Sequence, residues 1–425
     1  MKKNITPIRI GIDLDNTIIS YDKAFQLEAI EQGLVERGCS FNKKDLRDEV
    51  RKRTNGESKW QKLQGYVYGE GIHKAMLFPG LYRFLWRCKE REIDVEVVSH
   101  KTEYGHFDIK KKSLREAANN FLINQGLLDS DNPLIMKVTY KSTKAEKIDY
   151  ITKSNFEWFI DDLEEIIFSK ELKNQKGILF SSDNISVMNS NKVIAYSWEE
   201  ISQKVLGNWE LSEVKSMTNS IGNKRDTEIV EKLQGRGNSA IYKLHLSNGS
   251  KSALKIYPEI SYHDRLKSEF DSTKFFKELS IPNVQKPIAF DKRLGIATYE
   301  WIEGEKVTNY GIKELKAALS FLSILHQNSK AKQFKFFPMA ADACPKALDI
   351  EKQIERRLFQ FREASIKYTE LEEFLNNDFI PLMKKIITWS KLSWPVKLDY
   401  ERPIEKDELI LSPSDFGFHN ALYSE

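Results

Sequence analysis

The chain has 425 residues, 40% hydrophobic and 30% charged, which is the balance of a globular protein with two domains or more. Its 66 basic and 62 acidic residues nearly cancel, so the net charge of +4 indicates neither a nucleic-acid nor a membrane partner. The chain has no long uncharged apolar stretch, no secretory signal and no CxxC pair among its three cysteines, so we expect a cytoplasmic protein without a zinc or disulfide framework.

The first half alternates short apolar strands with helices. Strands are predicted over 8–14, 93–98, 136–140, 156–160, 177–182 and 192–197. Helical patterns cover 20–90, with breaks near Gly38, Gly56 and Pro79–Gly80, then 109–126 and a segment that begins near Ser142. This alternation predicts an α/β domain over 1–205, with a Rossmann-like, doubly wound parallel sheet and helices on both faces.

The second half has a different pattern. Residues 206–225 are polar and weakly periodic, and we interpret them as a linker. Strands with glycine-rich turns follow from residue 226, and helical segments dominate from 261 to 395. We therefore predict a second, α+β domain over 226–425.

Polar clusters stand where the predicted strands of the first half end. They comprise Asp13 and Asp15, Ser99, Lys144 at a helix start, and the pair Asp161 and Asp162. An open parallel sheet has its active site beyond the carboxyl ends of its strands, so these side chains are expected to converge. A single acidic dipeptide is often only a turn or a helix cap, but four clusters in this order favour a catalytic site.

The residue types in these clusters suit phosphate chemistry. A carboxylate such as Asp13 can attack phosphorus, and Asp15, two residues later at a strand end, points to the same side and can serve as the acid. The charge on the phosphoryl group must be neutralised by a cation held by oxygens, by a lysine and by a hydroxyl donor. Asp161, Lys144 and Ser99 supply these groups.

Over about 200 residues this pattern resembles the haloacid dehalogenase (HAD) superfamily. The resemblance implies that Asp13 is the nucleophile, that Asp15 is the general acid and base, and that Ser99 is the hydroxyl of the second motif. The lysine of the third motif matches Lys144 in STKAEKI, with Lys147 as the second choice. The implied Mg²⁺ ligands are Asp13, Asp15, Asp161 and Asp162, and the implied substrate is a small phosphorylated metabolite.

About 80 residues separate Thr17 from Ser99, and in the family such an insertion is a small helical cap over the site, here about 20–90. Candidate substrate-reading residues in it are Lys59, Trp60, Lys62 and Tyr66; the alternative is that they are ordinary helix-surface residues. His100 and Lys101 follow Ser99 and are expected to line the pocket. His106 is interpreted as a loop residue.

Three features of the second half are suited to binding the phosphates of a nucleotide. Gly235 and Gly237 lie between predicted strands, where backbone amides can approach phosphates, although such a pair is often a simple turn. Lys255 lies in an apolar strand, a position that kinases use to hold the α and β phosphates but that can also face solvent. Glu269, on a predicted helix, could pair with it.

The segment LSPSDFGFHNAL (411–422) resembles the catalytic loop of the aminoglycoside and choline kinase families, and the likeness extends from about 226 to the end. It implies that Asp415 is the catalytic base and Asn420 a Mg²⁺ ligand, with Pro413 in place of the usual histidine. The sequence ends at Glu425, before the family's further Mg²⁺-binding aspartate. We therefore expect a protein-kinase-like domain that is C-terminally incomplete.

The sequence thus predicts a Mg²⁺-dependent phosphatase fused to a kinase-like phosphotransferase module that uses ATP or another nucleoside triphosphate. The alternative is a phosphatase gated by a catalytically inactive, nucleotide-binding module. A purely structural role is disfavoured, because clustered carboxylates without a cation cost stability.

Overall fold

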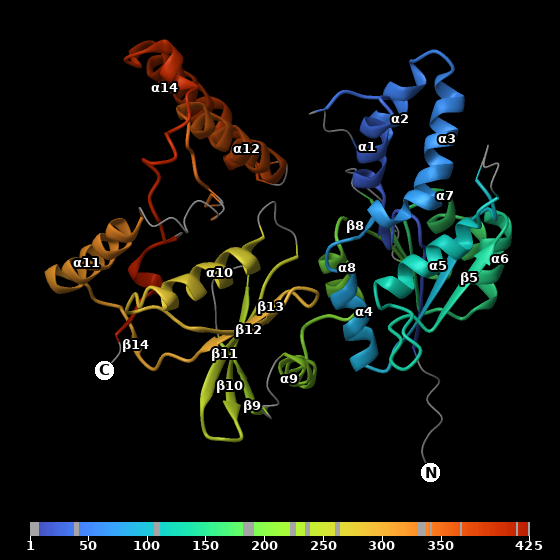
Figure 1. The fold of residues 1–425 in the computed structure, drawn as a ribbon, viewed down its shortest axis with the longest axis horizontal. Helices are drawn as coiled ribbons and strands as arrows, with labels where there is room; N and C mark the ends of the chain where they lie inside the picture. Colours follow the sequence, from blue (N-terminus) through green and yellow to red (C-terminus); the bar gives the residue numbers. More distant parts are fainter. Residues whose placement is uncertain are drawn as a thin grey trace. The chain divides into compact units, whose positions relative to one another are not determined.

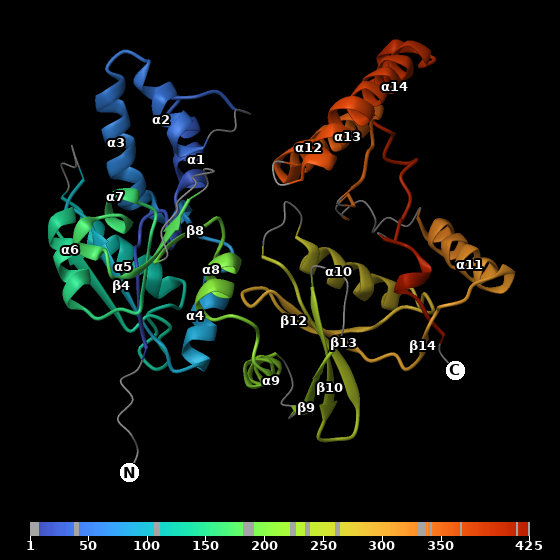
Figure 2. The same ribbon diagram turned by 180° about the vertical axis from the view of Figure 1, so that it is seen from behind.

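The computed structural model of the chain describes residues 8–37, 42–105, 111–181, 191–221, 227–233, 239–259, 264–329, 337, 339–340, 342–365, 368–413 and 415–423. Within it the chain forms two compact units (Figures 1 and 2). The first comprises Met1–Lys267 with Pro287–Trp301, and the second Ser268–Lys286 with Ile302–Glu425.

A six-stranded parallel sheet forms the centre of the first unit, in the order β5-β4-β1-β6-β7-β8. Its strands are β1 (Arg9–Ile12), β4 (Asp94–His100), β5 (Lys137–Lys141), β6 (Trp158–Asp161), β7 (Lys176–Phe180) and β8 (Lys192–Ala195). Each corresponds to a strand expected from the sequence. The predicted doubly wound parallel sheet is therefore confirmed.

Helices cover this sheet on both faces. They are α4 (Leu81–Glu90), α5 (Leu114–Asn124), α6 (Lys144–Lys153), α7 (Glu164–Ile167), the 3₁₀ helix η2 (Lys170–Leu172) and α8 (Trp198–Val205). Phe159 and Ile160 are neighbours in β6, yet each belongs to a different buried cluster. Since successive strand residues point to opposite faces, both faces of the sheet are covered.

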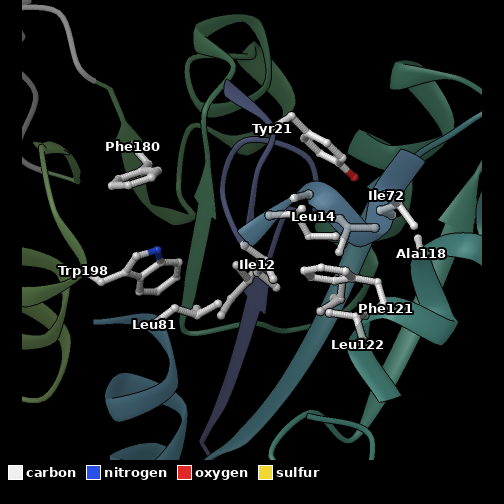
Figure 3. Packing of buried hydrophobic residues seen from close by; sticks show 14 of the residues in the cluster. Ile12, Leu14, Tyr21, Ile72, Leu81, Ala118, Phe121, Leu122, Phe180 and Trp198 are labelled. Atoms are coloured by element: carbon white, nitrogen blue, oxygen red, sulfur yellow. The ribbon is translucent and has the colours of Figure 1, made fainter. Parts of the chain in front are cut away.

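The larger of these clusters contains the residues around β1. Figure 3 shows Ile12 and Leu14 between Leu81 and Trp198 on one side and Phe121 on the other. Ile12, Leu14 and Leu81 are completely buried. The chain that leads to Asp13 and Asp15 is therefore held by close packing on both sides.

A small helical cap follows β1. It consists of α1 (Asp22–Glu31), α2 (Lys43–Arg51), α3 (Gly56–Tyr68) and the 3₁₀ helix η1 (Glu70–Lys74), and β2 (Ile19–Ser20) pairs with β3 (Met76–Leu77) at its base. Phe25 of α1 stacks on Trp60 of α3, with ring centroids 5.1 Å apart. In Figure 1, α1, α2 and α3 stand beyond one end of the parallel sheet. A helical cap is thus present, but it ends at β3; α4, which the predicted range of about 20–90 included, covers the sheet instead.

The first unit also holds a five-stranded antiparallel sheet in the order β12-β13-β11-β10-β9. Its strands are β9 (Thr227–Lys232), β10 (Ala240–Leu246), β11 (Lys251–Ile256), β12 (Pro287–Asp291) and β13 (Ile296–Glu300). The stretch 206–225, interpreted as a linker, contains α9 (Leu211–Ser220). Val214 and Met217 of α9 are buried in one cluster with Tyr242 and Leu254 of this sheet.

Helices dominate the second unit. They are α10 (Arg265–Glu278), which spans the boundary between the units, α11 (Ile312–Asn328), α12 (Ala347–Ser365), α13 (Thr369–Phe374), the π-helix η4 (Leu375–Phe379), α14 (Ile380–Ser393), and the 3₁₀ helices η5 (Lys397–Tyr400) and η6 (Phe418–Asn420). Two short strands, β14 (Glu305–Lys306) and β15 (Leu422–Tyr423), pair antiparallel. An antiparallel sheet followed by helices is the predicted α+β arrangement. Among the described helices, none combines the length and apolar character needed to cross a membrane.

A buried carboxylate joins three elements of the parallel sheet and its helices. Glu96 of β4 is 4% exposed and accepts hydrogen bonds from Thr139 Oγ1 at 2.7 Å, Tyr150 Oη at 2.6 Å and Arg9 Nη2 at 2.7 Å. Burial alone would raise the pKa of Glu96, but these hydrogen bonds and Lys137 bring it below its ordinary value. Glu96 is therefore a satisfied, ionised group that ties β1, β5 and α6 to β4.

We predict that Glu96→Ala lowers the free energy of unfolding by about 2–3 kcal/mol, less than the 3–5 kcal/mol of a fully buried pair because Arg9 keeps some contact with water. Urea unfolding followed by circular dichroism measures the change. Glu157→Ala is the matched control, since Glu157 pairs with Lys176 at the surface and its loss costs less than about 1 kcal/mol. Equal losses for the two variants would contradict the role given to Glu96.

Candidate active site

A buried lysine joins two aspartates at the ends of neighbouring strands. Lys147 Nζ of α6 lies 2.5 Å from Asp13 Oδ1 and 2.7 Å from Asp161 Oδ2. Lys147 and Asp161 are completely buried and Asp13 is 4% exposed. Asp13 directly follows β1 and its backbone N–H donates to the Ile160 carbonyl of β6 at 2.8 Å, so the two strand ends are held side by side. The predicted convergence of these aspartates is what the structure shows.

The structure reverses our preference between the two candidate lysines. Helix α6 begins at Lys144, with Thr143 as its N-cap, so Lys144 is the first helical residue and lies at the surface in an ion pair with Glu165. Lys147 lies almost one turn further on and shares a helix face with the buried Ile151. Lys144 and Lys147 are three residues apart and lie on a similar side of α6, so they differ in position along the helix: Lys147, one turn further on, reaches Asp13, whereas Lys144 stays in the exposed first turn.

Three carboxylates form a candidate cation site. Asp13, Asp161 and Asp162 each offer one oxygen within 4.8 Å of the others. Asp161 Oδ1 accepts from the Leu163 amide at 2.9 Å, and its buried Oδ2 lies 2.7 Å from the Lys147 ammonium. Hard oxygen ligands that carry an excess of negative charge fit Mg²⁺.

The pKa values of this cluster show the same excess charge. Burial raises the pKa of Asp13 well above its ordinary value; Lys147 opposes the rise, and the neighbouring carboxylates of Asp161, Asp162 and Asp15 add to it. Burial, together with the charge of Asp161, raises the pKa of Asp162 to about 7. Carboxylates that repel one another in a buried site are stabilised by a bound cation.

Asp15 has its own cationic partner. Lys101 Nζ lies 2.8 Å from both carboxylate oxygens of Asp15, and Tyr21 Oη donates to Oδ1 at 2.7 Å. Burial alone would raise the pKa of Asp15, but the Lys101 ammonium and the hydrogen bonds from Lys101 and Tyr21 bring it below its ordinary value. Lys101, expected to line the pocket, thus contacts the predicted acid and base directly.

Ser99 and His100 end β4 beside β1. The register pairs Ile12 with Val97, so Ser99 lies at the same sheet edge as Asp13, and it is 1% exposed. His100 is half-buried; burial lowers its pKa, and Lys147 and Lys144 add to the effect. His106 falls outside the described residues.

The cap residues at the site differ from the predicted candidates. Trp60 belongs to the cap core, Tyr66 packs against that core, and Lys59 and Lys62 lie at the surface. Instead, Lys43 Nζ of α2 lies 2.7 Å from Tyr68 Oη of α3 and 3.4 Å from Asn16 Oδ1.

Sequence reasoning missed Lys43, Tyr68 and Tyr21. Among the residues that Lys43 contacts, only Asn16 could have been linked to the site from the sequence, because it lies inside the Asp-x-Asp-x-Thr segment that contains Asp13 and Asp15. Which cap residue reaches that segment depends on how α2 and α3 pack, and no local pattern encodes it.

In the second half, the candidate nucleotide residues lie on different elements. Lys255 is on β11, the third strand of the antiparallel sheet in chain order, with Nζ 4.9 Å from the centre of the Tyr257 ring. Glu269 is on α10 and accepts from Gln285 Nε2 at 3.2 Å. Gly235 and Gly237 lie outside the described residues.

Asp415 and Asn420 are in contact. Asn420 Nδ2 donates to the Asp415 carbonyl at 2.9 Å and to Asp415 Oδ2 at 3.1 Å. His419 Nε2 lies 3.3 Å from Asp415 Oδ1, and the Asp415 side chain is mostly exposed. The structure thus brings the two residues of the predicted catalytic loop together.

Comparisons with known proteins concern each half separately. No protein-family model matches the chain, and no curated protein matches it. A HAD-superfamily hydrolase of subfamily IA from Geobacter sulfurreducens is 11% identical with a TM-score of 0.31, and the match covers 48% of this chain and 97% of that one. A phosphoserine phosphatase, solved as a phospho-aspartyl intermediate analogue, is 15% identical with a TM-score of 0.29 over 47% of this chain and 99% of that one.

For the C-terminal part, the structural neighbours are kinases. The choline kinase of Streptococcus pneumoniae is 15% identical with a TM-score of 0.22, and the match covers 37% of this chain and 56% of that kinase. The chain therefore spans little more than half the length of this neighbour.

We predict that Lys147→Met binds Mg²⁺ at least about ten-fold more tightly than the unaltered protein, because the ammonium competes with a cation for oxygens of Asp13 and Asp161. Isothermal titration calorimetry with MgCl₂ measures the affinity. Lys144→Met removes the same charge from the surface of the same helix and leaves the affinity unchanged. An equal effect of the two substitutions, or none from either, would contradict the placement of Lys147.

Proposed function

We propose that the first half is a Mg²⁺-dependent phosphatase that acts on a small phosphorylated metabolite through an aspartyl-phosphate on Asp13. The observation that carries the proposal is Asp13 itself, a buried carboxylate that shares a lysine with Asp161 and offers an oxygen within 4.8 Å of oxygens of Asp161 and Asp162. A nucleophile, a cationic partner and a candidate cation site thus meet at one point.

The first half-reaction uses Asp13 and Asp15. A carboxylate oxygen of Asp13 forms a bond to phosphorus while the bond from phosphorus to the leaving oxygen breaks, and Asp15 gives that oxygen a proton. Asp15 follows Asp13 by two residues at the strand end, and Lys101 and Tyr21 hold its carboxylate in place. The incoming phosphate dianion raises the proton affinity of the adjacent carboxylate, which favours the protonated form that this step needs.

In the second half-reaction, water attacks phosphorus and gives a proton to Asp15. The bond between phosphorus and Asp13 breaks, inorganic phosphate leaves, and the Asp13 carboxylate is restored. The lowered pKa of Asp15 makes it a carboxylate once it has given up its proton, the form that accepts the proton of water in this step and so restores the acid for the next turnover. Bound Mg²⁺, held by Asp13, Asp161, Asp162 and the Asp15 carbonyl, would supply positive charge for the phosphoryl oxygens, beside Lys147 and the Ser99 hydroxyl.

We predict that the protein releases phosphate from p-nitrophenyl phosphate only with Mg²⁺, and that Asp13→Asn lowers kcat at least about a thousand-fold, because an amide cannot act as the nucleophile. Release of p-nitrophenolate measures the rate. Asp149→Asn, on the exposed face of α6, is the control and retains full activity. Activity that survives in Asp13→Asn would exclude Asp13 as the nucleophile.

For the second half we propose a nucleotide-binding module that gates the phosphatase, in preference to an active phosphotransferase. Lys255 lies on the third strand, where kinases place their phosphate-binding lysine. Asp415 and Asn420 are in contact as a catalytic loop requires. However, the acidic cluster found in the described part of the chain, Asp13 with Asp161 and Asp162, belongs to the first half. Nucleotide binding therefore has more support than phosphoryl transfer.

We predict that saturating ATP with Mg²⁺ raises the melting temperature by about 5 °C, as expected when ligand at a hundred times its Kd adds about 2.7 kcal/mol. Lys255→Met is expected to abolish this shift because it removes the charge that faces the phosphates. Lys251→Met, on the same strand, serves as the control and retains the shift. Differential scanning fluorimetry measures both. An ATP-dependent shift that persists in Lys255→Met would contradict the proposed site.

A further inference from the structure

Lys43 is a cap lysine placed beside the active site without an ionic partner. Its ammonium lies 2.7 Å from Tyr68 Oη and 3.4 Å from Asn16 Oδ1, and both of these oxygens belong to neutral groups. Within the described part of the chain, no carboxylate forms an ion pair with it. The rings of Phe25 and Tyr68 lie 5.3 Å from Nζ and shield it from water on two sides.

This environment is costly for a lone cation. Burial lowers the pKa of Lys43, and the more distant carboxylates of Asp15, Asp162 and Asp22 offset the effect only in part. A partly buried ammonium is stabilised when an anion contacts it directly. The site therefore has a place for an anion that this chain does not itself supply.

Two contacts connect Lys43 to the reacting groups. On one side, Asn16 accepts from Lys43 and donates through Nδ2 to Asp162 Oδ2 at 3.3 Å. On the other, the Tyr68 ring lies 4.6 Å from Lys101 Nζ, and Lys101 is bonded to Asp15. Lys43 is thus two contacts from the candidate cation site and close to the predicted acid.

The position of Asp15 indicates which part of a substrate Lys43 meets. Under the proposed function, Asp15 gives its proton to the leaving oxygen, so the alcohol part of the substrate lies next to Asp15. Tyr68 and Lys43 extend from Asp15 into the cap. An anion on Lys43 therefore belongs to the alcohol and not to the phosphate that is transferred.

Resting on the proposed function, we propose that the substrate is a phosphate monoester whose alcohol carries a second anionic group, bound by the Lys43 ammonium and the Tyr68 hydroxyl. Lys43 has an N–H left after its two contacts, and the Tyr68 hydroxyl, which accepts from Lys43, has its own proton to donate. Two converging donors match two oxygens of a carboxylate or of a phosphate. Lys43 is a specificity-determining residue in this assignment.

The test compares matched probes that differ in one group. 3-Phosphoglycerate carries a carboxylate where glycerol 3-phosphate carries a hydroxymethyl group, and propane-1,3-diol bisphosphate compared with its monophosphate tests a phosphate as the second anion. The readout is the ratio of kcat/KM for the anionic probe to that for the neutral probe. We expect a ratio of at least about ten for one of the two pairs, because a neutral group leaves the buried ammonium unpaired.

Lys43→Gln is expected to bring that ratio to about one, and Tyr68→Phe to lower it. Lys43→Arg keeps the charge and retains most of the preference, which separates a charge effect from a folding defect. Lys44→Gln removes the neighbouring exposed lysine and leaves both rates unchanged. A ratio near one in the unaltered protein, or a preference that survives Lys43→Gln, would overturn the inference.

Hydrolysis of p-nitrophenyl phosphate separates this inference from the proposed function. If that activity is present and depends on Asp13 while neither anionic probe is preferred, the proposed phosphatase function is supported and the proposed second-anion site is wrong. If no probe is hydrolysed, the proposed function fails, and the assignment of Lys43 fails with it.

Discussion

The site depends on a single buried ammonium. Asp13 and Asp161 stand at the ends of adjacent strands, and two carboxylates buried side by side repel each other strongly unless a cation lies between them. Lys147 supplies that cation, with Nζ within 2.7 Å of an oxygen of each. The parallel sheet brings the carboxylates together, and α6 makes their proximity stable. Packing of Ile151 on the same helix face fixes where the ammonium lies.

One ammonium does not balance the whole cluster. Asp162 adds a third carboxylate beside the pair; burial raises the pKa values of Asp13 and Asp162, and repulsion between the carboxylates adds to the rise. A divalent cation would relieve this repulsion, and Asp13, Asp161 and Asp162 each offer one oxygen within 4.8 Å of the others. Stability and function are therefore linked here: the charge excess that destabilises the empty cluster is what gives it affinity for a cation and for a phosphoryl group.

The sequence was sufficient to place residues whose position is determined by a local pattern. It was insufficient for residues whose position depends on how the elements pack. Apolar runs that end in acidic residues placed Asp13 and Asp161 at one sheet edge, because parallel strands share their carboxyl edge. The lysine was misplaced because both Lys144 and Lys147 lie in the first turns of α6. The two lysines lie three residues apart on a similar side of the helix, so counting from the cap at Thr143 does not separate them; only packing does, since Lys147 is completely buried and Lys144 pairs with Glu165 at the surface. Lys43 and Tyr68 had no such signal, since two cap helices must pack before their side chains meet.

The stretch 206–225 is a second place where the sequence pattern did not indicate how the residues pack. Polar sequence with weak periodicity is typical of a linker, but here it carries Glu213, which is 1% exposed and binds both Arg87 of α4 and Arg91, the residue directly after α4. A charged residue that is buried in an ion pair looks like a surface residue in the sequence. Its burial depends on a partner that can lie far away along the chain. The consequence reaches the site: α4 leads directly into β4, the strand that ends at Ser99, and α9 binds this helix while packing on the antiparallel sheet. The antiparallel sheet and the strand that ends at Ser99 are therefore connected by direct contacts through α9 and the arginines at the end of α4.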